Sequence, residues 1–161
     1  MKFLNVFAAV IVLSTSLVGC GETKETHDHD RAYHSENGDL RETTASIEVL
    51  PAFLDDQEPF IRGAYIVASQ HTDILDWIPC YCGCGEIAGH QSNKNCFIHE
   101  VKEDGSVVWD DHGTRCGVCM QIAVESAEMK KDGMSLKEIR EAIDHKYGEG
   151  YGNPTPTPMP M

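Results

Sequence analysis

The hydrophobic positions of this chain form helical and alternating patterns between residues 47 and 148, and polar segments flank them on both sides. After Pro59, apolar residues recur at helical spacing, at Ile61, Ala64, Tyr65 and Ala68. With Asp56 as its cap and a proline in its first turn, this segment predicts a helix. A further helical turn is expected over 72–77.

The next stretch alternates in the way that strands do. Apolar positions at 96–101 and 106–109 flank Asp104-Gly105, a pair typical of a tight turn, so the pattern predicts a β-hairpin. Gly113 interrupts the second strand. A helix is expected to begin near Cys116 and to end near Lys131.

The last helix has the clearest start signal. Ser135 and Glu138 form a capping box, and an apolar stripe runs from there to Gly148: Leu136, Ile139, Ile143 and Tyr147. The expected fold is therefore mostly α with a small β-hairpin, its helices packed around a cysteine-rich site.

Polar composition marks the two ends of the mature chain. Residues 20–46 predict a flexible stalk, 47–149 the domain, and 150–161 a disordered tail with alternating prolines. The stalk carries a loose histidine patch, at His27, Asp28, His29, Asp30 and His34. Such a patch binds divalent metals weakly, or is simply hydrophilic.

The first 19 residues predict an export signal. Lys2 precedes an apolar run that is too short for a membrane span. The run ends in Leu17-Val18-Gly19-Cys20, which resembles the bacterial lipobox. That resemblance implies cleavage before Cys20, a lipid on its sulfur, and a lipid-anchored place on the extracytoplasmic face of the membrane.

Charge excludes one class of partner. The chain holds 13 basic and 26 acidic residues, and the signal segment holds one lysine and no acid, so the mature chain carries −14. This charge argues against nucleic acid and favours a cation or a basic partner, although acidity also serves solubility.

Apart from Cys20, the chain has six cysteines, which fall in three groups: Cys80, Cys82 and Cys84; Cys96; Cys116 and Cys119. Outside the cytoplasm an even set is compatible with disulfides. Alternate side chains of an extended segment share one face, so the first three sulfurs can meet at one centre. A disulfide between positions i and i+2 is strained. The spacing favours a thiolate metal site, or pairing with distant cysteines.

Cys116-x-x-Cys119 suits metal binding and redox exchange equally. At a helix start, free amides and Arg115 would stabilise a thiolate at Cys116. Auxiliary ligand candidates are His90, His99, His112 and Met120, with His90 and His112 strongest because both flank cysteines. Soft donors select Cu(I), zinc or iron–sulfur clusters, and this set would suit two zinc ions or a small Cu(I) cluster.

Two families resemble parts of the chain. Pro79-Cys80-Tyr81-Cys82-Gly83-Cys84, with the lipobox, Gly89-His90, Asn95–Ile98 and the Cys116/Cys119 pair, resembles the PCYCGC-motif lipoproteins of Gram-positive bacteria over about 51–148. That family is defined by its motif, and the resemblance implies a lipoprotein outside the cytoplasm. Residues 115–148 are similar to the thiol-reductase subunit of cytochrome c maturation, whose RCxxC pair exchanges disulfides; four further cysteines upstream depart from it.

Three functions remain open on these grounds. The preferred one is a membrane-anchored protein that binds copper or zinc and works with a protein partner in metal transfer. A thiol–disulfide oxidoreductase acting through Cys116/Cys119 is the second. A scaffold stiffened by three disulfides is the third. No Ser/His/Asp arrangement or phosphate-binding glycine loop indicates other catalysis.

Overall fold

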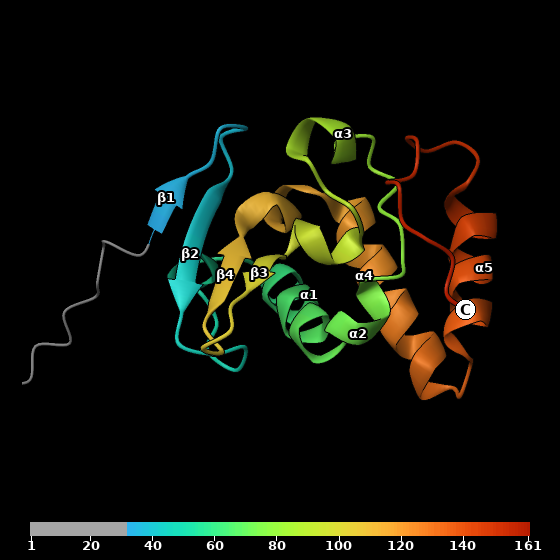
Figure 1. Ribbon diagram of the computed structural model, residues 1–161, viewed down its shortest axis with the longest axis horizontal. Helices are drawn as coiled ribbons and strands as arrows, with labels where there is room; N and C mark the ends of the chain where they lie inside the picture. Colours follow the sequence, from blue (N-terminus) through green and yellow to red (C-terminus); the bar gives the residue numbers. More distant parts are fainter. Residues whose placement is uncertain (1–31) are drawn as a thin grey trace, which may run out of the picture.

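The computed structural model describes residues 32–161, which place a small antiparallel sheet beside a group of helices (Figure 1). The sheet has the strand order β1-β2-β4-β3. Its strands are β1 (Ala32–His34), β2 (Leu40–Thr44), β3 (Ile98–Val101) and β4 (Val107–Asp110). The predicted hairpin is confirmed as β3 and β4. Gly105 turns between them with φ at 85°, a conformation that glycine adopts without strain.

Residues 32–161 form five α-helices. They are α1 (Pro59–Gln70), α2 (Thr72–Leu75), α3 (Gly85–Ala88), α4 (Gly117–Lys131) and α5 (Leu136–Tyr147). Short 3₁₀ turns lie at Ala52–Leu54, Asn93–Cys96 and Asp111–Arg115. The mostly α fold with a small sheet is confirmed.

Local start and stop signals explain these boundaries. The Ser135 hydroxyl accepts from the Glu138 N–H and the Glu138 carboxylate accepts from the Ser135 N–H, so the predicted capping box begins α5. Pro59 is the first residue of α1, where its missing N–H costs nothing. The residue at the cap position of α1 is Glu58, so the prediction of Asp56 as the cap was wrong.

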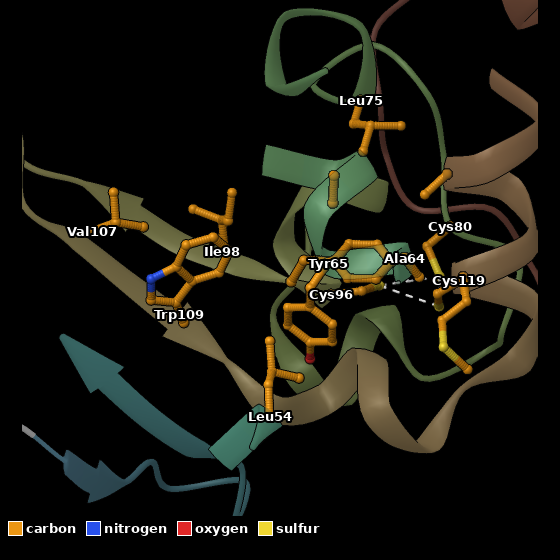
Figure 2. Packing of buried hydrophobic residues seen from close by; sticks show 14 residues of the cluster. Leu54, Ala64, Tyr65, Leu75, Cys80, Cys96, Ile98, Val107, Trp109 and Cys119 are labelled. Atoms are coloured by element: carbon orange, nitrogen blue, oxygen red, sulfur yellow. Dashed lines mark hydrogen bonds between the residues drawn. The ribbon is translucent and has the colours of Figure 1, made fainter. Parts of the chain in front are cut away.

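Two clusters of buried side chains hold the elements together. The first joins the sheet to α1 and α4 around Tyr65, whose ring meets Phe97 edge-on at 5.1 Å between centroids. It includes three cysteines, which Figure 2 shows on the side of Tyr65 away from Trp109: Cys80, Cys96 and Cys119. The second cluster packs the apolar stripe of α5 against α2 and α4. The cysteine site is thus part of the core.

The start of the domain was predicted too late. Part of the expected stalk forms β1 and β2, and β2 pairs with β4 in the sheet. The Thr44 hydroxyl accepts from the Trp109 indole N–H at 2.8 Å, and Glu42 accepts from the N–H groups of Ala52 and Phe53. Long-range pairing thus orders a polar segment that has no hydrophobic periodicity. Of the histidine patch, His34 lies in β1; residues 27–30 lie outside the described residues.

The C-terminal tail follows a defined path, so the expectation of disorder from residue 150 was wrong. It runs back between α5 and the segment that carries the first cysteines (Figure 1). Cys80 and Thr155 exchange two hydrogen bonds, N–H to Oγ1 at 2.9 Å and N–H to carbonyl at 3.0 Å. The Gly152 N–H donates to the Tyr81 carbonyl at 2.9 Å. Alternation of proline and threonine turns the threonines inward, where Thr155 bonds to the backbone of Cys80 and the Thr157 hydroxyl donates to the Gln91 carbonyl.

Arg140 fixes the far end of this tail. Its guanidinium donates to the carbonyls of Thr157 and Pro158, and its Nε donates to Asp144 at 2.8 Å. The Tyr81 hydroxyl donates to the same Asp144 carboxylate at 2.7 Å. The motif, the tail and α5 therefore share one hydrogen-bond network. Within residues 32–161, no helix has the length and apolar character needed to cross a bilayer.

Candidate metal centre

Three separate segments meet at the cysteine site. They are the loop between α2 and α3, the 3₁₀ turn 93–96, and the start of α4. Between them they carry all six cysteines of the described chain, which are free thiols: Cys80, Cys82, Cys84, Cys96, Cys116 and Cys119. The predicted convergence of the three groups is what the structure shows.

Glycines allow these segments to approach one another. Gly83 has φ at 78°, which turns the chain between Cys82 and Cys84. A Cβ at Gly113 would lie 2.8 Å from the Cys96 carbonyl oxygen and 2.8 Å from the Phe97 ring. The turn that carries His112 therefore packs directly on the segment that carries Cys96.

Five of the six sulfurs form a connected network. Cys119 Sγ lies 2.9 Å from Cys80 Sγ, 3.2 Å from Cys96 Sγ and 3.1 Å from Cys116 Sγ. Cys80 Sγ lies 3.2 Å from Cys82 Sγ and 3.6 Å from Cys96 Sγ. A framework of three disulfides gives each sulfur one partner, whereas Cys119 has three sulfur neighbours. The arrangement matches shared ligation better than pairwise bridges.

The donor set fits a soft metal ion. With Zn–S bonds near 2.3 Å, two sulfurs on one tetrahedral ion are about 3.8 Å apart. The sulfurs here, at 2.9–3.6 Å, have to spread by less than about 1 Å to surround an ion. Sets of three ligand atoms lie within 4.8 Å of one another at Cys80/Cys96/Cys119, Cys82/Cys84/His112 and Cys82/Cys116/Cys119.

His112 is held by a carboxylate, Asp39, that no sequence pattern singles out. Its Nδ1 lies 3.1 Å from Asp39 Oδ2, and its backbone N–H donates to Asp110 at 3.0 Å. Asp39 is buried and also accepts from Arg115 and from Asn37. A carboxylate on one ring nitrogen orients a histidine and raises its basicity toward a metal on the other. Asp39 therefore belongs to the site.

His90 completes the inner side of the site. Its Nδ1 lies 3.6 Å from Cys96 Sγ, and its ring meets His112 edge-on at 4.7 Å between centroids. His90 is only 3% exposed, and its Nε2 has no hydrogen-bond partner among residues 32–161. Burial, together with the charge of His112, lowers its pKa and favours the neutral imidazole that binds metals.

The thiols differ in pKa because of the hydrogen bonds among them. A sulfur that accepts hydrogen bonds is stabilised as the thiolate, whereas a thiol that donates one is stabilised in its protonated form. Hydrogen bonds from Cys116 and Cys119 lower the pKa of Cys82 to about 4, with a further contribution from His112. Burial and the bond to Cys82 raise the pKa of Cys84 to about 11. Contact with Cys82 raises the pKa of His112 to about 9, so the two form an ion pair at neutral pH.

Cys82 should therefore show a reactivity that hardly depends on pH. In the reduced, metal-free protein, we expect the rate of iodoacetamide labelling at Cys82 to stay nearly constant between about pH 6 and 8, because its thiolate is already formed. Labelling of Cys84 should rise about tenfold per pH unit. Mass spectrometry of the peptide that holds both residues measures the two rates in one sample. Parallel pH profiles would contradict the assignment.

An open hollow of about 570 Å³ leads to one side of the site. It is lined by partly exposed site residues, namely Cys82, Cys84, His112 and Cys116, together with Arg115, two tyrosines, Tyr81 and Tyr151, and small residues of the tail and α4. A second hollow, of about 410 Å³, borders His90. Cys80, Cys96 and Cys119 line neither hollow; they are at most 1% exposed. The site thus has an outer side that faces solvent and an inner side within the core.

The structure places the predicted auxiliary ligands differently. His90 and His112 lie beside the cysteines. His99 lies near Arg41 at 3.3 Å on the sheet. Met120 is buried in the same core cluster as Cys80, Cys96 and Cys119. Arg115, expected to stabilise the Cys116 thiolate, instead pairs with Asp39 and Asp111. Cys20 lies outside the described residues.

Comparison with known proteins gives one match. The family model described as "Protein of unknown function with PCYCGC motif" matches residues 9–160. No curated protein and no solved structure matches the chain. The similarity of 115–148 to the thiol-reductase subunit of cytochrome c maturation therefore stays a prediction.

Proposed function

We propose that this chain, which belongs to the family of proteins of unknown function with a PCYCGC motif, binds a soft metal ion through clustered cysteine thiolates. The observation that carries the proposal is the connected network of five sulfurs next to a histidine that Asp39 orients. Thiolates and imidazoles together favour Cu(I) or Zn²⁺ over hard ions.

The place and process that we propose follow from the N-terminal segment. The lipobox-like end of the signal segment supports cleavage before Cys20 and a lipid on its sulfur, which would anchor the chain outside the cytoplasm. In that place the protein would handle copper or zinc and pass the ion to a protein partner. The open hollow beside Cys82 and Cys84 supports transfer, since a ligand of a partner has access from solvent.

Metal analysis and thiol counting on one sample test the proposal. The full-length chain would be purified from cells in detergent without oxygen, and its metal content measured by element-specific mass spectrometry. We expect stoichiometric copper or zinc, and six reduced thiols besides the lipid-modified Cys20 once the metal is removed. Protein without metal whose thiols are paired as disulfides would overturn the proposal.

Asp39→Asn should weaken metal binding without removing a ligand. Loss of the carboxylate leaves the His112 ring without its orienting partner, and we expect affinity to fall about 10–100-fold. Competition with a chelator of known affinity measures the change. Asp111→Asn is the matched control because Asp111 also pairs with Arg115 but makes no contact with the His112 ring. An equal loss of metal affinity in both variants would show that the negative charge near Arg115 supports binding and that the orientation of His112 does not.

Thiol–disulfide exchange is the second candidate, favoured by the Cys116/Cys119 pair. Cys116 lines the open hollow, and Cys119 Sγ lies 3.1 Å from it inside the core. The Cys116 thiolate would attack a substrate disulfide and release one substrate thiol. Cys119 would then displace the second thiol and leave a Cys116–Cys119 disulfide. Insulin reduction that Cys116→Ser abolishes, in a protein without metal, would favour this function.

A further inference from the structure

We propose that the site holds two metal ions that are not equivalent, one enclosed in the core and one that exchanges through the hollow. This inference rests on the proposed metal binding. Eight soft donors meet here, six sulfurs and two imidazoles, which is twice the number that one tetrahedral ion takes. Position divides them into two sets of three cysteines and one histidine. The inner set is Cys80, Cys96, Cys119 and His90; the outer set is Cys82, Cys84, Cys116 and His112.

The inner set is enclosed by protein. Its three sulfurs lie 2.9–3.6 Å apart, and all three side chains belong to the first core cluster. His90 approaches Cys96 at 3.6 Å. His90 is assigned to the inner set because Nδ1 is its ring nitrogen that faces Cys96, and an ion beside Cys96 would be bound through Nδ1.

The outer set faces the hollow. Its four residues are partly exposed and all line the same wall. Cys82, Cys84 and His112 place one ligand atom each within 4.8 Å of one another, and Cys116 meets the same limit with Cys82. An ion held here has protein on one side and solvent on the other.

The two sets touch, so the ions would be neighbours. Cys82 and Cys119 belong to different sets, yet their sulfurs lie within 4.8 Å of each other. An incoming ion would meet the outer set first, because of the eight donors only the outer four line this hollow. Gly117 and Gly152 add no side chain to its wall, so a thiolate or imidazole of a protein partner has room to enter between Tyr81 and Tyr151. The outer ion is therefore the one exchanged, and the inner ion serves the fold.

Zinc counting and zinc release together test this division. The full-length chain, reduced and freed of metal without oxygen, would be loaded with Zn²⁺ alone and examined by native mass spectrometry. We expect two ions per chain. On addition of excess EDTA, one ion should leave about tenfold faster or more, because release of the enclosed ion needs local opening of the core. Cys84→Ser should lose the fast ion and keep the slow one.

The outcomes separate this inference from the function on which it rests. No bound zinc would count against metal binding itself. One ion per chain would leave metal binding intact and overturn the two-ion site, as would two ions released at one rate or the loss of both ions in Cys84→Ser. Cys96→Ser makes the same change in the inner set and should lose the slow ion. If that variant does not fold, the rates of zinc release from the unaltered chain still decide between two different ions and two equivalent ones.

Discussion

Cys119→Ser is expected to abolish most of the metal binding of this protein. Cys119 Sγ touches three other sulfurs, Cys80 and Cys96 of the inner set and Cys116 of the outer set, so its substitution disturbs both sets. A serine hydroxyl is a poor ligand for a soft ion. With the metal at 100 times its Kd, loss of binding removes about 2.7 kcal/mol of stability. Thermal unfolding of the loaded protein, followed with metal content, measures both effects.

Ser126→Ala provides the control for this experiment. Ser126 is also fully buried on α4, and its hydroxyl has no hydrogen-bond partner among residues 32–161. Removal of that hydroxyl should leave metal content unchanged and stability equal or slightly higher. If Cys119→Ser retained stoichiometric metal, the network would not be the binding site.

Gly152→Ala is expected to detach the C-terminal tail from the motif. An added Cβ would lie 2.3 Å from the Gly83 nitrogen and 2.5 Å from its Cα, and these are backbone atoms that cannot move aside. The tail must then give up its bonds to Tyr81 and Cys80. We expect destabilisation by about 1–3 kcal/mol and faster proteolysis after residue 150. Thermal unfolding and limited proteolysis measure these changes.

Gly63→Ala makes the same change where there is room. A Cβ at this position in α1 has no atom within 4 Å, and alanine is the better helix former, so stability should rise by about 0.5–1 kcal/mol. A tail that resists protease equally in both variants would contradict the close contact of Gly83 with Gly152.

Helices and the hairpin were predictable because their signals are local. Pro59, the Asp104-Gly105 turn and the capping box at Ser135 each act within a few residues, so the sequence alone places them. Strand β2 has the sequence Leu-Arg-Glu-Thr-Thr, which carries no apolar alternation. Its order comes from pairing with β4, far away in the chain, and no local pattern reports such pairing.

The convergence of the candidate site residues was predictable, and the groups that support them were not. Cysteine spacing and the flanking glycines pointed to six thiols with His90 and His112, and the structure brings these residues together; that they bind a metal stays a prediction. Asp39 lies 73 positions before His112, in a polar segment where one more acidic residue has no special meaning. The tail was misjudged for a related reason. The prolines of the tail indicate an extended backbone. The residues that hold this backbone in place, Cys80 and Arg140, lie far from the tail in the sequence.

The contact between Thr155 and Cys80 sets an order of events during synthesis. The two residues are 75 positions apart. A chain that is synthesised from its N-terminus cannot close this part of the fold until Thr155 has been added, since contacts of large sequence separation form late. Until then the backbone of the first cysteine group lacks the partners that the tail supplies at Cys80 and Tyr81.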